Sequence, residues 1–172
     1  MTGRYRFSEP LADHHDVSGF TCRSTEQTDW LRRHAHQSSA SGTTRVFVVT
    51  EPDAASVVAY YGWCMAQLAP TEAPTRLRKG AGRYPQPVAL LARLGVDIAH
   101  EGRGLGAALL KDAFLRLVAL SDDIGCRGLL VHAESPEARD FYLHLVPEFE
   151  PSPTDDLHLV LLMKDIQRTL RR

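Results

Sequence analysis

One stretch decides the fold that we expect: His100-Glu101-Gly102-Arg103-Gly104-Leu105-Gly106. It follows an apolar run, Pro87 to Ile98, which is typical of a strand buried on both faces. It precedes a predicted helix that ends near Ser121, because apolar residues recur there at helical spacing. A chain that passes through glycines into a helix leaves backbone N–H groups unpaired, and such groups bind anions. The stretch therefore predicts a pyrophosphate-binding turn.

The segments on either side of this turn predict a mixed sheet. We expect, in order, a strand over 4–11, a helix over 25–41, a hairpin over 45–50 and 56–68, a long surface loop over 69–86, the strand and helix of the turn, a strand over 127–133, a helix over 136–145, final strands at Phe149 and 157–163, and a frayed terminal helix or tail. This order predicts an α/β (α+β mixed sheet) fold, with a central mixed sheet and helices on both faces.

Composition limits the class of protein. A chain of 172 residues with 44% hydrophobic residues fits one domain, 1–172, and we place its cofactor-binding core at about 87–145. The net charge of −1 gives no general attraction to nucleic acid, so any RNA partner needs a local basic patch. The three cysteines show no CxxC pairing, and no run approaches the ~20 apolar residues of a membrane span. We therefore expect a cytoplasmic protein without a membrane contact.

The glycine turn itself narrows the cofactor. It has no lysine after the glycines and lacks the GxGxxG spacing, so a nucleoside triphosphate or a dinucleotide fits poorly. The run Glu101 to Gly106 instead resembles the acetyl-CoA signature of the GCN5-related N-acetyltransferases (GNAT), in which Arg or Gln precedes the glycines. Glu101 departs from that pattern, and its carboxylate should weaken the electrostatics of the site without abolishing it.

Further segments resemble the acetyltransferase toxins of type II toxin–antitoxin systems. They are Phe20-Thr21-Cys22, 29–35, 41–49, 91–97 and 151–155. The resemblance implies a single-domain GNAT fold and a toxin that uses acetyl-CoA to acetylate the α-amino group of aminoacyl-tRNA, which inhibits translation. It also implies a ribbon-helix-helix antitoxin and a homodimer. The pair Cys22-Arg23 departs from the usual Cys-Gly, and 145–149 replaces a shorter link.

The resemblance also assigns site residues. It places Tyr142 as the general acid that protonates the coenzyme A thiolate, although a packed core aromatic would show the same helical spacing. It places the cofactor on the following residues: Leu94, Gly95, Val96, Glu101, Gly102, Arg103, Gly104, Leu105, Gly106, Ala107 and Phe141. Backbone amides near 94–96 are the expected oxyanion donors.

Basic residues are the candidates for tRNA contact, although a solvated charged face explains each of them equally well. They are Arg32, Arg33, Arg76, Arg78, Lys79 and Arg93. Arg93 stands in an apolar strand, so it needs a partner or must face the cleft. His14-His15 and the pair His34 and His36 do not have metal-ligand spacing, so we expect no metal.

Two other functions share most of these features. An ordinary GNAT enzyme acting on a small amine or a protein N-terminus would differ only in its acceptor. A non-catalytic acyl-CoA sensor or scaffold would have the same cofactor-binding turn but would not require Tyr142 as a general acid. A ribbon-helix-helix protein encoded next to this chain would favour the toxin.

Overall fold

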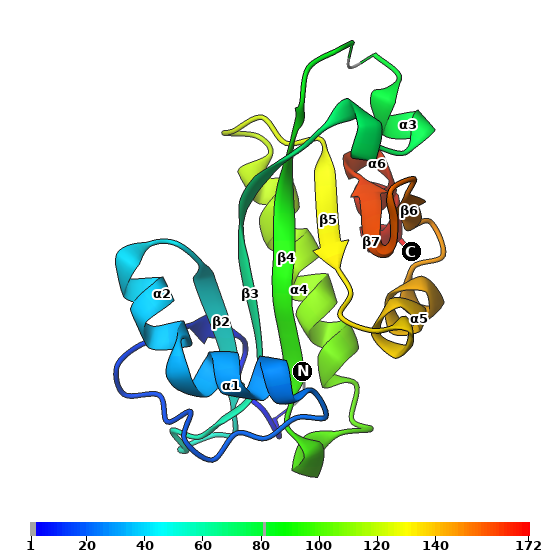
Figure 1. The fold of residues 1–172 in the computed structure, drawn as a ribbon. Coiled ribbons are helices and arrows are strands. Elements are labelled where there is room, and N and C mark those ends of the chain that lie inside the picture. The colour runs from blue at the N-terminus through cyan, green and yellow to red at the C-terminus, as the bar shows by residue number, and fades with distance from the viewer. Residues whose placement is uncertain (1–2, 81) are drawn as a thin grey trace. The chain divides into compact units, whose positions relative to one another are not determined.

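The strands of the chain form one mixed sheet in a computed structural model that describes residues 3–80 and 82–172 (Figure 1). The strands, in chain order, are β1 (Glu9–Pro10), β2 (Arg45–Thr50), β3 (Val57–Leu68), β4 (Gln86–Val96), β5 (Gly128–His132), β6 (Glu150–Ser152) and β7 (Asp155–Leu162). Their order in the sheet is β1-β2-β3-β4-β5-β7-β6. β4 and β5 are parallel, whereas β2 and β3 are antiparallel, so the expected α/β mixed sheet is confirmed.

Helices and short 3₁₀ turns connect the strands. They are α1 (Thr25–Arg33), α2 (Ala35–Ser41), η1 (Pro70–Glu72), α3 (Thr75–Arg78), η2 (Ile98–His100), α4 (Leu105–Leu120), α5 (Pro136–Leu145) and α6 (Met163–Leu170). None of the helices in the described residues is both long and apolar enough to cross a bilayer. The chain divides into two compact units, Met1–Cys64 with Ala92–Asp112 and Met65–Leu91 with Ala113–Arg172.

In the first unit, helices lie on both faces of the strands. Tyr60 and Tyr61 are neighbours on β3, so their side chains point to opposite faces. The Tyr60 hydroxyl donates to the Gln27 carbonyl oxygen of α1, at 2.7 Å. The Tyr61 hydroxyl donates to the Asp112 carboxylate of α4, also at 2.7 Å. Both rings are fully buried, and these two bonds tie α1 and the first part of α4 to β3.

In the second unit, the segment between β3 and β4 covers the sheet. We expected a surface loop over 69–86, but the structure folds part of it into η1 and α3. Leu77 of α3 and Ala73 are fully buried against Val88, Leu130 and Val160. In the sequence, prolines, glycines and basic residues surround these two apolar residues, so the segment shows no apolar pattern that would predict its burial.

Three other expected elements differ in extent. The strand expected over 4–11 is regular only at Glu9–Pro10, although the Arg6 and Leu11 N–H groups also donate to carbonyl oxygens of β2, each at 2.9 Å. The single helix expected over 25–41 is broken at His34, whose φ of −122° is not helical. The frayed terminal helix or tail expected at the C-terminus is the helix α6, which a fully buried Ile166 anchors.

The pairing of β5 with β7 depends on a glycine, and this dependence can be tested. A Cβ at Gly128 would lie 2.2 Å from the Leu161 carbonyl oxygen, so Gly128→Ala must push β5 and β7 apart. We expect a loss of about 1–3 kcal/mol in the free energy of unfolding, measured by urea denaturation. Gly125→Ala is the matched control, because no atom lies within 4 Å of its Cβ. Equal stabilities of the two variants would contradict this packing.

Candidate active site

The glycine turn forms the start of α4 as the sequence predicts. Gly102 and Gly104 have φ values of +74° and +79°, which side chains other than glycine rarely adopt. The Gly104 carbonyl oxygen accepts the first helical hydrogen bond, from the Ala108 N–H at 3.0 Å. Gly104 is therefore the N-cap, and the N–H groups of residues 105–107 have no partner within the helix. A Cβ at Gly102 or Gly104 would meet no atom within 4 Å, so open space lies beside the turn.

The chain that leads into this turn is held by one aspartate. Asp97 accepts from the Ala99 N–H at 2.9 Å through one carboxylate oxygen and from the Thr21 N–H at 3.0 Å through the other. The Ile98 N–H donates to the Thr21 carbonyl oxygen at 2.9 Å. These bonds join η2 to the segment that precedes α1, and so they set the direction in which the turn enters α4.

The Glu101 carboxylate is paired with a residue that the sequence analysis did not assign to the site. The Arg23 guanidinium donates to both Glu101 carboxylate oxygens, with Nε at 2.8 and 3.1 Å and a terminal nitrogen at 2.9 Å. This contact raises the pKa of Arg23. Glu101 and Arg23 both stand at positions where the sequence departs from the pattern that the resemblance leads us to expect. The expected weakening by Glu101 is thus offset by a cation beside the same turn.

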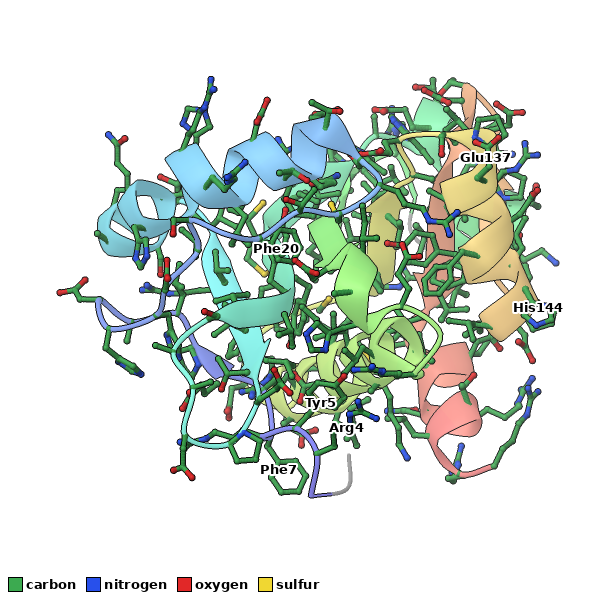
Figure 2. The ribbon with its side chains drawn as sticks, turned by 90° about the horizontal axis from the view of Figure 1, so that it is seen from below. Arg4, Tyr5, Phe7, Phe20, Glu137 and His144 are labelled. Atoms are coloured by element: carbon green, nitrogen blue, oxygen red, sulfur yellow. The ribbon has the colours of Figure 1, made fainter. Side chains whose placement is uncertain are left out.

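The Arg103 side chain points toward the N-terminal segment. Its guanidinium donates to the Tyr5 hydroxyl at 2.8 Å. The Tyr5 hydroxyl lies 2.8 Å from Nδ1 of His100, and the two rings meet edge to face. Figure 2 labels Tyr5 in this segment. These contacts contain no carboxylate, so the Arg103 guanidinium remains available to an anion bound at the turn.

The last residues of β4 lie beyond the pairing of this strand with β5. That pairing joins Ala89–Leu91 to Leu129–Val131, and residues 94–96 follow it. Gly95 is packed closely: a Cβ there would lie 3.1 Å from the Tyr60 ring and 3.4 Å from the Cys22 sulfur. The backbone at 94–96 is therefore held in place by the aromatic core of the first unit.

Tyr142 lies in the second unit, on α5, which begins with a Ser135 cap and Pro136. Its ring is 6% exposed and packs edge to face against Phe141 and Phe149. Among the described residues, no hydrogen bond is made by the Tyr142 hydroxyl. Burial, together with the charge of Glu134, raises the pKa of Tyr142, so the phenol keeps its proton.

The basic candidates differ in how their charges are used. Arg93 binds Glu26 at 3.0 Å and lies 5.3 Å from the centre of the Trp30 ring, so it has the partner that its strand position requires. Arg32 donates to the Ser18 carbonyl oxygen at 2.8 and 2.6 Å, which holds the preceding loop. Arg33 is exposed on α1.

In the second unit, Arg76 binds two carboxylates, Arg78 donates to Thr75 at 3.4 Å, and Lys79 is exposed.

The structure also brings together Glu9, His14 and His15, a grouping that the sequence spacing does not reveal. Nδ1 of His15 accepts from the Ala12 N–H at 2.9 Å. Nε2 of His15 must therefore carry the proton, and it donates to Glu9 at 2.9 Å. Both nitrogens of this buried ring are used, so the grouping acts as a structural anchor for the N-terminal segment.

Known proteins resemble the chain over nearly its whole length. A tRNA-acetylating toxin of Mycobacterium tuberculosis is 43% identical over 165 residues, which are 96% of this chain and 96% of that protein. The probable toxin TacT of Sinorhizobium fredii is 27% identical and covers 94% of this chain and 93% of its own length. No protein-family profile matches the chain.

Solved structures share the fold. AtaT complexed with acetyl-methionyl-tRNAfMet has a TM-score of 0.85 at 24% identity, over 95% of this chain and 98% of that one. A tyrosine-to-phenylalanine variant of AtaT, bound to the C-terminus of the antitoxin AtaR and to acetyl-CoA, has a TM-score of 0.80 at 22% identity, over 98% and 99%. The fold is that of a GNAT-type acetyltransferase. Within this class, the chain belongs to the family of the tRNA-acetylating toxins.

The role of the turn can be tested at Gly104. Gly104→Val puts a branched side chain into the open space where a pyrophosphate would approach the free N–H groups. Hydrogen bonds to charged groups contribute about 1.5–3 kcal/mol each, so losing two of them should lower acetyl-CoA affinity ~100-fold or more. Isothermal titration calorimetry measures this affinity. Gly80→Val is the control, because φ there is +78° and nothing lies within 4 Å. Unchanged affinity in a folded Gly104 variant would refute the assignment.

The Arg23–Glu101 pair predicts a compensation effect. Arg23→Ala should weaken acetyl-CoA binding about 3- to 5-fold, because it leaves an uncompensated carboxylate beside the turn. The double variant Arg23→Ala, Glu101→Gln should return to within about twofold of the parent, since both charges are then absent. The difference between the single and double variants should shrink in 1 M salt, where the Debye length is about 3 Å. If Arg23→Ala binds like the parent at low salt, Arg23 has no part in the site.

Proposed function

We propose that this protein is an acetyl-CoA-dependent N-acetyltransferase, a toxin that acetylates the α-amino group of aminoacyl-tRNA and so blocks translation. The observation that carries the proposal is the turn at α4: the N–H groups at 105–107 have no helical partner, and open space lies beside Gly102 and Gly104. Positive-φ glycines and the Arg103 cation suit a pyrophosphate at this place, and Arg23 offsets the charge of Glu101. The toxin relative supports tRNA as the acceptor.

We assign each part of the reaction to residues of this chain. Bound acetyl-CoA would supply the acetyl thioester that the amine attacks. Residues 101–107 hold the pyrophosphate through backbone N–H groups and Arg103, and Phe141 contributes apolar contact. The backbone at 94–96 positions the acyl group and donates to the developing oxyanion. Tyr142 gives its phenolic proton to the departing sulfur, and its raised pKa keeps that proton available throughout the neutral range.

The acceptor needs no strong base on the protein. An α-amino group titrates near ~8, so about a quarter of it is neutral at pH 7.5 and can attack directly. The ammonium proton formed by the attack leaves to solvent. Because the net charge of −1 leaves RNA attraction to local patches, the proposed contacts to the tRNA backbone are the basic candidates that form no ion pair in the described residues: Arg32, Arg33, Arg78 and Lys79. Arg76 and Arg93, which bind carboxylates, are the weaker candidates.

The proposal extends to partners and location. A ribbon-helix-helix antitoxin neutralises the toxin, in keeping with the AtaT–AtaR complexes and with the DNA-bound KacTA complex among proteins of the same fold. The toxin works as a homodimer in the cytoplasm, where charged tRNA and acetyl-CoA are present. Its three cysteines are free thiols, as a reducing compartment requires.

Tyr142→Phe tests the catalytic assignment, because it keeps the ring and removes only the acidic proton. With charged tRNA and labelled acetyl-CoA, kcat should fall ~10²- to 10⁴-fold while acetyl-CoA affinity stays nearly unchanged. The parent should arrest growth of a bacterium that lacks the antitoxin, and the variant should not. Phe149→Leu, which alters the packing beside Tyr142 without removing its hydroxyl, is the control and should lose stability more than rate.

Two results would contradict the proposal at different points. Parental turnover by Tyr142→Phe would make Tyr142 a packing residue. Label that appears on a small amine or a protein N-terminus, but not on charged tRNA, would keep the acetyltransferase and refute the tRNA acceptor.

A further inference from the structure

A basic cavity lies in the second unit, apart from Tyr142. Its volume is about 500 Å³, and it is lined by Arg76, Lys79, Cys126, Arg127, Leu162, Met163 and Lys164. Residues 126–127 precede β5, whereas α5 follows the other end of that strand, so the cavity and the Tyr142 helix lie at opposite ends of β5 (Figure 1). A five-residue strand spans roughly 16 Å, which separates the cavity from the acetyl-transfer chemistry.

The charges around this cavity are not balanced. Arg76 is neutralised, since it binds Glu150 at 3.0 Å and the buried Asp165 at 2.9 Å. The positive charge of Arg127 is not compensated, because both of its acceptors are uncharged. They are the Gln86 side-chain oxygen at 2.6 Å and the Leu77 carbonyl oxygen at 3.3 Å. In the described residues, Lys79 and Lys164 form no ion pair. Three cations therefore line the cavity without a compensating acid.

The framework of the cavity is rigid on one side. The Arg127 carbonyl oxygen accepts from the Met163 N–H at 3.0 Å, which joins the start of β5 to the start of α6. Met163 and Lys164 are the first two residues of α6, whose N-cap, Leu162, has no side-chain acceptor. Asp165 lies in the first turn of this helix and is bound by Arg76, so the positive charge at the cavity comes from Lys79, Arg127 and Lys164. Lys79, the residue that follows α3, also lines the cavity.

We propose that this cavity binds a backbone phosphate of the tRNA, away from the aminoacyl end. The proposal rests on the acceptor assigned above and adds Arg127 and Lys164 to its contacts. A guanidinium held by two hydrogen bonds, together with two exposed ammonium groups, suits a phosphodiester, which carries one charge and several acceptor oxygens. A long polyanion can occupy this cavity and still place its esterified amine at the other end of β5. Such a contact strengthens binding and takes no part in catalysis.

Charge reversal at Lys164 and Lys79 tests the site. Lys164→Glu should not disturb α6, because an acid in the first turn favours a helix. Fluorescence anisotropy with an uncharged tRNA minihelix should show about a 10-fold higher Kd for each variant and a salt slope smaller by about one. With charged tRNA, KM should rise while kcat and acetyl-CoA affinity stay at the parental values. Arg171→Glu, at the far end of α6, is the matched control and should bind like the parent.

The outcomes separate this inference from the proposed function. Variants that keep the parental Kd, salt slope and KM overturn the cavity assignment, and so does a loss confined to an acidic protein partner. The minihelix measurement involves no acetyl transfer. If the parent fails to acetylate charged tRNA, the proposed function fails, and the minihelix still decides whether the cavity binds RNA phosphate.

Discussion

The candidate site depends on backbone N–H groups that a helix cannot satisfy by itself. The first residues of α4, 105–107, present these groups because Gly104 caps the helix without a side chain. The positive φ values of Gly102 and Gly104 bring the chain into α4 without covering that end. Asp97 fixes the approach by its bonds to Ala99 and Thr21. The anion site is therefore a property of backbone geometry, and side chains adjust its charge.

The turn can contain Glu101 because a neighbouring cation, Arg23, compensates the charge of its carboxylate. A carboxylate alone would repel a pyrophosphate, but Arg23 holds both of its oxygens. The two residues are 78 positions apart in the sequence, so neither suggests the other by spacing. A change at one position of such a pair favours a change at the other, because either change alone leaves an unbalanced charge beside the cofactor.

In the second unit, the same principle separates structural cations from available ones. Arg76 meets two carboxylates and serves to hold β6 and α6, whereas Arg127 meets only neutral oxygens and retains its charge. The number of basic residues in a segment is thus a poor guide to its electrostatic potential. What matters is whether the acceptor of each cation carries a charge of its own.

The sequence by itself determined the mixed sheet, the turn, and the helices on either side of it, because glycine positions and apolar periodicity are local properties. The family was also recognisable from short segments such as Phe20-Thr21-Cys22. Only the tertiary structure decided which charges meet, that Leu77 is buried under the expected surface loop, and that Arg127 joins Lys79 and Lys164 at one cavity. Those features depend on residues far apart in the chain, and a sequence pattern carries no distance between them.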